Sequence, residues 1–415
     1  MTGERSFEHP SGRGASDQRR EAAMQLGSIR RSNVAAIAQV ILNRGHISRA
    51  EIASVVGLSP GAVTKITAQL LKAGFIAESE TRATNHDLGR PRVPVGVDRR
   101  VYRFAGVHLG LRRSTVGLTD LAGDVVAQRV AEHRRRDSES VLQEARNLLA
   151  EVVAADGGNV LGAGVCTGGW VDPATGVVRE QPVLGWSDVQ LRAAVGDLDI
   201  PVFVDSSVRA LALAEARFGA GRDAANVVYA FVGNIVGAAH LLDGRVAVGR
   251  DAAAGTIEHL TVGPRSGTRC NRGHTDCLWA LGSDVAVVQK ARTEGLIPPR
   301  GQLEQVVACS LRTSDPTARR AEMLLRERAR YAGVAVGVLL DIFDPDVVVL
   351  AGGLLQAPNL LPALHKAAAE RATRHSDVSD LVVPTGLGPY GLVRGAASLA
   401  LDHFYRDPLA LLGHR

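Results

Sequence analysis

The sequence predicts a protein of the α/β class that begins with a separate helical unit. With 415 residues, of which 46% are hydrophobic and 22% charged, the chain is long enough for two to four domains and apolar enough to fold. Its first hundred residues carry 15 Lys and Arg against 9 Asp and Glu, whereas the remaining residues carry 33 against 34. Beyond residue 98, strand-like and helix-like segments alternate, which is typical of α/β domains.

Composition and hydropathy exclude several classes of protein. No uncharged apolar run reaches the roughly 18 residues that a spanning helix needs, and the most apolar stretch, 334–355, is interrupted by Asp341, Asp344 and Pro345. Residues 1–27 are polar and lack the apolar segment of a secretory signal. We therefore expect a flexible N-terminal tail, a cytoplasmic location and no membrane partner. Four cysteines are too few for a disulfide scaffold, which also fits a reducing compartment.

Residues 28–97 have the pattern of three short helices. Apolar residues recur at helical spacing over 32–43, and Gly45 ends that run. Ser48 and Glu51 form a capping box for a second helix, which Gly57 ends after about two turns. Ser59, followed by proline, caps a third helix. Its apolar stripe is Val63, Ile66, Leu70 and Leu71.

Two short helices joined by a tight turn, after a supporting helix, form a helix-turn-helix, whose second helix enters the major groove of DNA. A strand at Phe75-Ile76, a polar excursion over 77–92 and a returning strand through Val95 add a wing. The alternative is a helical hairpin that contacts only protein, but the caps, the wing and the positive charge together favour DNA binding. The expected DNA contacts are Arg49, Ser59, Gly61, Ala62, Thr64, Lys65, Gln69, Arg90 and Arg92.

The rest of the chain repeats one pattern of strands and helices. The first series has strands at 102–109, 114–119 and 125–130 and a helix at 138–155; the second has strands at 202–204, 227–232, 240–242 and 347–350 and helices at 208–218 and 318–343. This repetition predicts two lobes. We expect the first lobe over 98–204, completed by 385–410, and the second over 205–384.

Several segments resemble the ROK family of repressors, open reading frames and sugar kinases. They are Ser48-Arg49-Ala50-Glu51-Ile52-Ala53, Gly89-Arg90-Pro91, Val171-Asp172-Pro173-Ala174-Thr175-Gly176, Leu184-Gly185-Trp186, Ala214-Glu215 and Gly395-Ala396-Ala397. The resemblance implies a two-lobed, actin-like fold of the ribonuclease H-like sugar kinase type, with a ligand cleft between the lobes. The N-terminal winged helix-turn-helix makes the chain similar to the repressor-type members.

The residues that the resemblance assigns to phosphoryl transfer are altered. The catalytic base of the family's kinases, an Asp, aligns with Ser207, which cannot take a proton at neutral pH. Asp205 would have to reach the substrate from a displaced position. In the two phosphate loops, His108 stands in place of an Asp, and Gly233-Asn234-Ile235-Val236-Gly237 has lost a glycine and a small polar residue. We therefore expect no kinase activity, because the base and the phosphate anchors are needed together.

The sugar side of the cleft also departs from the family pattern. The family kinases' Gly-Glu-Ile-Gly-His segment aligns with Gly255-Thr256-Ile257-Glu258-His259. Glu258 either takes over the carboxylate's role from a displaced position or is a surface residue. The expected effector contacts are Gly169, Ser207, Glu258 and His259. The effector is a non-standard sugar, a different metabolite or absent.

The family's zinc motif is incomplete in this chain. His259, Cys270 and Cys277 match three ligands, whereas the middle Cys of the motif is Arg272. His274 lies between the two cysteines and is able to complete a Cys2His2 set, so we expect a structural zinc ion at His259, Cys270, His274 and Cys277. The alternative is a metal-free loop with two free thiols.

Together these features predict a transcriptional regulator, most simply a repressor, that controls carbohydrate uptake or metabolism. It would bind an inverted-repeat operator in double-stranded DNA as a homodimer or homotetramer, since two-fold protein symmetry imposes such an operator. Two alternatives belong to other classes. One is a sugar kinase fused to a DNA-binding module, and the other is a DNA-binding protein that needs no ligand.

Overall fold

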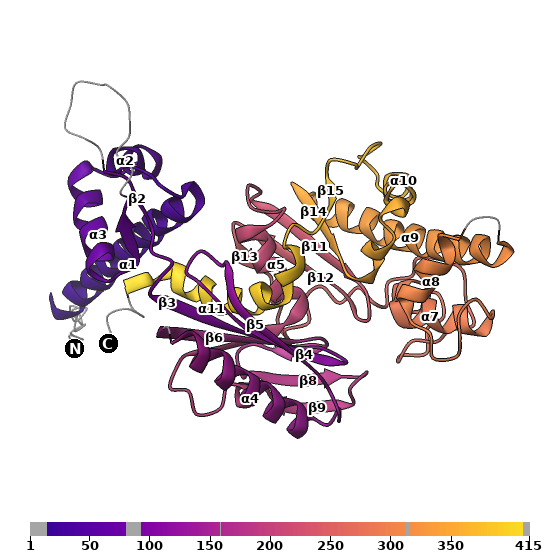
Figure 1. Cartoon of the computed structure of the whole chain (residues 1–415). Coiled ribbons are helices and arrows are strands. Elements are labelled where there is room, and N and C mark those ends of the chain that lie inside the picture. Colours follow the sequence, from indigo (N-terminus) through magenta and orange to yellow (C-terminus); the bar gives the residue numbers. More distant parts are fainter. Residues whose placement is uncertain (1–14, 80–92, 158, 313–314, 410–415) are drawn as a thin grey trace, which may run out of the picture. The chain divides into compact units, whose positions relative to one another are not determined.

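The computed structural model in Figure 1 describes residues 15–79, 93–157, 159–312 and 315–409, with side chains from Gly27 onward. The chain divides into two compact units. Unit 1 comprises residues 1–98 and 403–415, and unit 2 comprises residues 99–402. This division lies one residue from the expected boundary at 97/98. The segment 385–410, which we expected to belong wholly to the first lobe, is divided between the units.

Unit 1 contains the three expected helices and a two-stranded antiparallel sheet. These elements are α1 (Ala15–Arg44), α2 (Arg49–Val56), α3 (Pro60–Lys72), β1 (Ile76–Glu78) and β2 (Val95–Val97). The expected tail 1–27 differs from the structure, because α1 already begins at Ala15. Residues 15–26 are rich in Ala, Gln, Arg and Glu, all of which have high helix propensity.

The core of unit 1 is closed by aromatic residues from distant parts of the sequence. Phe75 is fully buried, and its ring centroid lies 5.5 Å from that of Phe404 and 5.7 Å from that of Tyr405. Both partners lie in the last turn of α11 (Gly391–Arg406). The other large apolar side chains of this core are Ile37, Ile41, Ile52, Val63 and Leu70. The last turn of the chain's final helix is thus part of the winged-helix core.

Unit 2 contains two five-stranded sheets with equivalent strand orders, β10-β6-β3-β4-β5 and β13-β12-β11-β14-β15. In each sheet, three strands joined as successive antiparallel hairpins are followed by two strands that add in parallel on the other side. The first sheet consists of β3 (Tyr102–Leu109), β4 (Arg113–Thr119), β5 (Val125–Glu132), β6 (Asn159–Thr167) and β10 (Val202–Ser206). The second consists of β11 (Asn226–Val232), β12 (Val236–Leu242), β13 (Arg245–Val246), β14 (Val347–Ala351) and β15 (Val382–Pro384). The repeated pattern in the sequence therefore corresponds to a repeated lobe.

Helices cover both sheets, and a small third sheet extends the first lobe. The helices are α4 (Ser138–Asp156), α5 (Ser207–Phe218), α6 (Leu278–Gly282), α7 (Asp284–Thr293), α8 (Leu303–Ser310), α9 (Pro316–Phe343) and α10 (Leu361–Arg371), and the third sheet is β7 (Trp170–Asp172), β8 (Val177–Gln181) and β9 (Trp186–Gln190). Short 3-10 helices occur at Leu191–Ala194, Gly353–Gln356, Pro358–Leu360 and Gly388–Tyr390.

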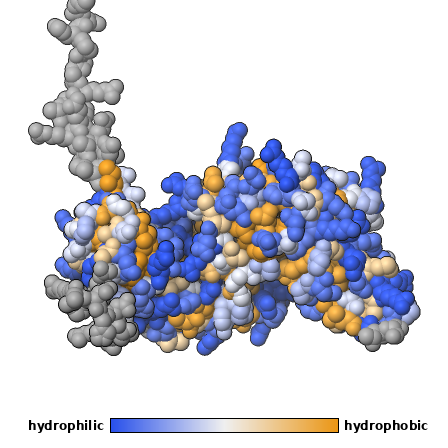
Figure 2. Space-filling model, turned by 90° about the horizontal axis from the view of Figure 1, so that it is seen from above, coloured by the Kyte–Doolittle hydropathy of each residue, from blue (hydrophilic) through white to orange (hydrophobic). Residues whose placement is uncertain are grey.

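Helix α11 packs directly on the first sheet, and glycines permit this close approach. A Cβ at Gly106 would lie 2.3 Å from the Val393 carbonyl oxygen, and one at Gly164 would lie 1.8 Å from that of Ala396. Gly106 belongs to the segment aligned with a phosphate loop, yet its role here is helix packing. Hydrophobic patches lie among hydrophilic residues on the face shown in Figure 2. Within the described residues, no helix combines the length and apolar character needed to cross a bilayer.

Candidate functional site

The helix-turn-helix of unit 1 is built by local capping. Ser48 and Glu51 form the expected capping box at the start of α2, and Gly57 ends that helix in the left-handed conformation with φ of 68°. Ser59 then accepts a hydrogen bond from the Ala62 amide and begins α3. One side of α3 is buried, through Val63, Ile66, Thr67 and Leu70. The opposite side exposes Gly61, Thr64, Lys65 and Ala68, with Ala62 and Gln69 half-buried beside them.

Some of the expected DNA contacts already have protein partners. The Thr64 hydroxyl donates to the Pro60 carbonyl at 2.8 Å. Arg49 forms an ion pair with Glu78 at 2.7 Å and donates to the Thr67 hydroxyl at 3.3 Å. In the free protein Arg49 therefore joins α2, α3 and β1. The two wing arginines, Arg90 and Arg92, lie outside the described residues.

Sequence reasoning missed one basic residue at the recognition helix. The guanidinium of Arg30, on the exposed surface of α1, donates to the Gln69 side chain at 3.1 Å. It adds a positive charge beside the expected base-contacting residues. Arg30 and Gln69 are 39 residues apart in the sequence. Helical periodicity relates only residues a few positions apart, so it could not predict this contact.

Unit 2 contains a cavity of about 300 Å³ at the expected effector site. Gly169, Glu258 and His259 line it together with Trp170, Arg209 and Arg272. Gly169 has φ of +92°, and a Cβ there would lie 2.4 Å from the Glu180 carbonyl oxygen, so the turn requires glycine. Burial raises the pKa of the Glu258 carboxyl, while the nearby Arg272 charge opposes that shift. Glu258 is therefore a cavity residue and not a surface one.

Ser207, the fourth expected effector contact, lines a different and larger cavity of about 690 Å³. It is the first residue of α5, directly after strand β10. His108 lines the same cavity. Burial, together with the charges of Arg113 and His133, lowers the pKa of His108 to about 4. At neutral pH both kinase carboxylate positions thus hold uncharged side chains.

Asp205 does not take over the base position, because a buried ion pair engages it. The Arg209 guanidinium lies 2.5 Å from the Asp205 carboxylate and is itself buried. It also donates to the carbonyl of Val171 at 2.7 Å and to that of Ala252 at 3.0 Å. Arg209 therefore links α5 to β7 and to the loop that precedes Glu258. Asp205 lines neither cavity.

The four expected metal ligands come together. The ligand atoms of His259, Cys270, His274 and Cys277 all lie within 4.8 Å of one another. Cys270 Sγ and His259 Nδ1 are 3.5 Å apart, the separation that two ligands of a tetrahedral zinc ion would have. Cys270 and His274 are brought together by a tight turn, in which the Cys270 amide donates to the His274 carbonyl. Burial, reinforced by the neighbouring His274 and Arg272, lowers the pKa of His259 and favours the neutral, metal-binding imidazole.

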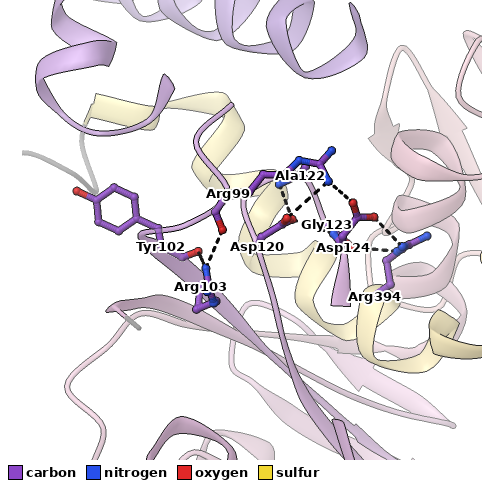
Figure 3. Close-up of polar contacts among 8 residues, drawn as sticks. All are labelled: Arg99, Tyr102, Arg103, Asp120, Ala122, Gly123, Asp124 and Arg394. Carbon is purple, nitrogen blue, oxygen red and sulfur yellow. Dashed lines mark hydrogen bonds and ion pairs between the residues drawn. The ribbon is translucent and has the colours of Figure 1, made fainter. Parts of the chain in front are cut away.

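A charged cluster lies at the start of unit 2 (Figure 3). Arg99, the first residue of the unit, forms an ion pair with Asp124 and lies 3.8 Å from Asp120. Arg394 of α11 lies 3.1 Å from the other oxygen of Asp124 and donates to the Gly123 carbonyl. Through Asp124, the cluster thereby joins Arg99 to Arg394 of α11.

The comparisons with known proteins agree with this geometry. Residues 104–403 match the ROK family, and residues 36–77 match the winged helix-turn-helix DNA-binding family. The DNA-binding transcriptional dual regulator NagC of Escherichia coli is 28% identical over 92% of this chain and 98% of its own length. A transcriptional regulator of Mycobacterium bovis is 31% identical over 92% of this chain and 87% of its own. A putative xylose repressor of Caldicellulosiruptor is 29% identical over 78% and 83%.

Solved structures give the same result. The crystal structure of a ROK family transcriptional regulator, a homologue of the E. coli MLC protein, superposes with a TM-score of 0.77 at 26% identity and covers 93% of this chain and 99% of its own. A ROK hexokinase from Thermus thermophilus covers 72% of this chain and 99% of its own with a TM-score of 0.59 and 26% identity. The chain belongs to the ROK family, among its transcriptional regulators with an N-terminal winged helix-turn-helix.

Proposed function

We propose that this protein is a transcriptional repressor that binds an inverted-repeat operator as a homodimer or homotetramer, releases it when a carbohydrate occupies unit 2, and lacks kinase activity. The observation that carries the proposal is a retained ligand cavity beside a lost catalytic base. The cavity that holds Glu258 and His259 is present, whereas Ser207 occupies the base position and Arg209 engages Asp205. Binding without turnover is what a regulator requires.

The relatives support a carbohydrate as the effector. One of them, 28% identical over 92% of this chain and 98% of its own, is the N-acetylglucosamine repressor of Escherichia coli O6:H1, and another is the putative xylose repressor of Caldicellulosiruptor. In this proposal the sugar binds one arrangement of the protein more tightly than the other and so shifts the population away from the operator-binding form. Arg209 is well placed for this role. It belongs to α5, the helix that begins at Ser207, and it donates to the Ala252 carbonyl in the loop that precedes Glu258.

DNA binding in this proposal uses the exposed side of α3. Lys65, Arg49, Ser59 and the wing arginines contact the phosphate backbone of the DNA, whereas Thr64 and Gln69 contact bases. The site of action is the nucleoid, in the cytoplasm. A protein that bound DNA without regard to sequence would lack the roughly 4 to 10 kcal/mol by which regulators prefer their operators.

Zinc has a structural role in this proposal. The set of two thiols and two imidazoles suits a closed tetrahedral site. A bound ion would fix the loop from His259 to Cys277. Glu258 directly precedes this loop, and its carbonyl accepts a hydrogen bond at 2.9 Å from the amide of Trp279 in α6, which directly follows the loop. The metal would thereby stabilise one wall of the effector cavity without taking part in chemistry.

Chromatin immunoprecipitation of the tagged protein tests the regulatory role. We expect a few sharp sites that share an inverted repeat and lie beside genes of carbohydrate uptake or metabolism. Diffuse occupancy of the chromosome would contradict the proposal.

Sugar kinase activity is the second candidate, favoured by the fold that this chain shares with a ROK hexokinase. A coupled assay for ADP release with common hexoses and pentoses decides between the two. We expect no release above the background of a protein-free control. Turnover that disappears in the Ser207→Ala variant would establish an enzyme instead.

A further inference from the structure

The two cavities of unit 2 adjoin each other. The larger, of about 690 Å³, and the smaller, of about 300 Å³, share Gly168, Gln181, Asn234 and Ile235 in their walls. Glycine at position 168 keeps the junction open, because a Cβ there would lie 2.9 Å from the Gln181 amide nitrogen and 3.0 Å from Ile235. Only the smaller cavity contains Glu258 and His259.

Three buried polar atoms around the larger cavity lack a strong hydrogen-bond partner among the described residues. They are Nδ1 of His108, Nε2 of Gln181 and Oγ of Ser207, the last of which has the weakly hydrogen-bonding Cys166 thiol beside it. The side chains of Gln181 and Ser207 are almost completely buried. Such atoms are rare in folded proteins, because each costs about 1 to 3 kcal/mol when it lacks a partner. Three of them on residues that line one cavity indicate groups that a ligand satisfies.

The chemistry of these groups selects an uncharged ligand with hydroxyl groups. The Gln181 amide nitrogen donates, while the Ser207 hydroxyl and the neutral His108 imidazole both donate and accept. No formal charge lies among the three.

The charged residues at the same cavity are close to balance. Two carboxylates, Glu132 and Glu304, line it with three guanidinium groups, Arg112, Arg113 and Arg292, while a third carboxylate, Asp284, is paired with the buried Arg328. The guanidinium groups of Arg112 and Arg292 already donate to Gln302 and to the Gly301 carbonyl. The lining therefore offers at most one positive charge in excess, fewer than the charge of a phosphate ester calls for, and this favours an uncharged ligand.

We propose that the effector is an uncharged carbohydrate of two sugar residues, one in the smaller cavity against Glu258 and one in the larger cavity against His108, Gln181 and Ser207. This inference rests on the proposed function and specifies its ligand. A cavity of 300 Å³ lies at the lower limit for small-molecule sites, and the adjoining 690 Å³ provides the space for a second ring. The replacement of the two kinase carboxylates by Ser207 and His108 is then an adaptation to hydroxyl groups in the larger cavity.

Calorimetric titration of the full chain tests the proposal with matched sugars. The pairs are N-acetylglucosamine with N,N′-diacetylchitobiose and xylose with xylobiose, because relatives are named for these monosaccharides. Glucose with cellobiose and N-acetylglucosamine 6-phosphate complete the panel. For at least one pair we expect the disaccharide to bind tenfold more tightly than its monosaccharide. Tighter binding of the monosaccharide phosphate, or equal affinity within every pair that binds, would overturn the inference.

The Ser207→Ala variant locates the second ring. It should bind the disaccharide about three- to tenfold more weakly, the usual effect of one lost hydrogen bond, and change the monosaccharide affinity much less. Its thermal stability without sugar should change little, because the hydroxyl loses only the weak Cys166 thiol as a partner. Equal weakening of both sugars, or no weakening of either, would contradict the assignment.

The outcomes separate this inference from the proposed function. If a monosaccharide releases operator DNA and its disaccharide binds no more tightly, the inference fails and the carbohydrate-responsive repressor stands. If no sugar of the panel binds and none changes operator affinity, both fail.

Discussion

Replacing Arg209 by methionine should destabilise unit 2 by about 3 to 5 kcal/mol, the usual effect of removing one partner from a buried ion pair. The guanidinium neutralises Asp205, which is only 6% exposed, and donates to the carbonyls of Val171 and Ala252. Without it the carboxylate keeps the Ser206 amide as a donor, and the two carbonyls lose the guanidinium. Against a typical total of 5 to 15 kcal/mol, this is a large fraction of the stability.

Urea unfolding followed by tryptophan fluorescence measures this loss selectively. All three tryptophans, Trp170, Trp186 and Trp279, lie in unit 2, so the signal reports that unit alone. The double variant Asp205→Asn with Arg209→Met should recover most of the loss, since it removes both charges. As a control, Arg326→Met should cost at most about 1 kcal/mol, because its pair with Glu322 is about half exposed.

The pH dependence of the Arg209→Met variant provides a second check. With no guanidinium beside it, the buried Asp205 should have a pKa above its unfolded value, since burial disfavours the carboxylate. Between the unfolded and the folded pKa of Asp205, the folded state then binds more protons than the unfolded state. The loss of unfolding free energy relative to the parent therefore grows as pH rises through this interval and shrinks as pH falls towards 4. A single variant that loses less than about 1 kcal/mol at pH 7, or a double variant no better than the single, would refute the reasoning.

Four further predictions concern other parts of the molecule. The purified chain should hold about one zinc ion, measured by mass spectrometry, and Cys277→Ser should abolish retention; a parent free of zinc after metal-supplemented purification would contradict this. Lys65→Ala should weaken binding to all DNA sequences alike and reduce the salt slope of binding by about one unit, measured by anisotropy at several salt concentrations. Phe404→Ala should destabilise unit 1 by about 3 to 5 kcal/mol and impair operator binding with sugar binding unchanged, measured by circular dichroism and calorimetry; equal loss of both would count against it. Burial lowers the pKa of His108 to about 4 in the folded state, so stability should fall as pH decreases from 6.5 to 4, and His108→Gln should flatten that dependence by up to about 3 kcal/mol in urea titrations.

Local signals were sufficient to predict the helix-turn-helix. The caps Ser48 and Ser59 and the left-handed Gly57 occur as expected, because each depends on residues no more than three positions away. The predicted start of α1 was wrong for a related reason. Residues 15–26 have high helix propensity but no apolar stripe, and the prediction relied on an apolar stripe.

Long-range packing was beyond the reach of the sequence. Strand β6 has only buried residues after Asn159 and contains two glycines, so it lacks the alternation that marks a half-buried strand. The reason for Gly164, the closeness of α11, lies more than 200 residues further along the chain. The same holds for Arg30 beside Gln69 and for Phe404 beside Phe75.

The candidate sites divide in the same way. The Cys2His2 ligands could be chosen because their spacing is local apart from His259, and their side chains do meet. The assignment of Ser207 to one effector site with Gly169 and Glu258 rested on family alignment, and the structure separates it into the adjoining cavity. Alignment places a residue on an element, whereas the neighbouring side chains determine which cavity it faces.

In the proposed mechanism, carbohydrate binding in unit 2 controls operator binding by unit 1. Fluorescence anisotropy of a labelled operator, titrated with the full chain at increasing concentrations of each sugar in the panel, tests it most directly. We predict that one sugar weakens operator affinity by about 5- to 150-fold, the usual range for coupled sites, and leaves binding to unrelated DNA unchanged. Operator affinity that stays constant across the whole panel and across cell extracts would contradict the account.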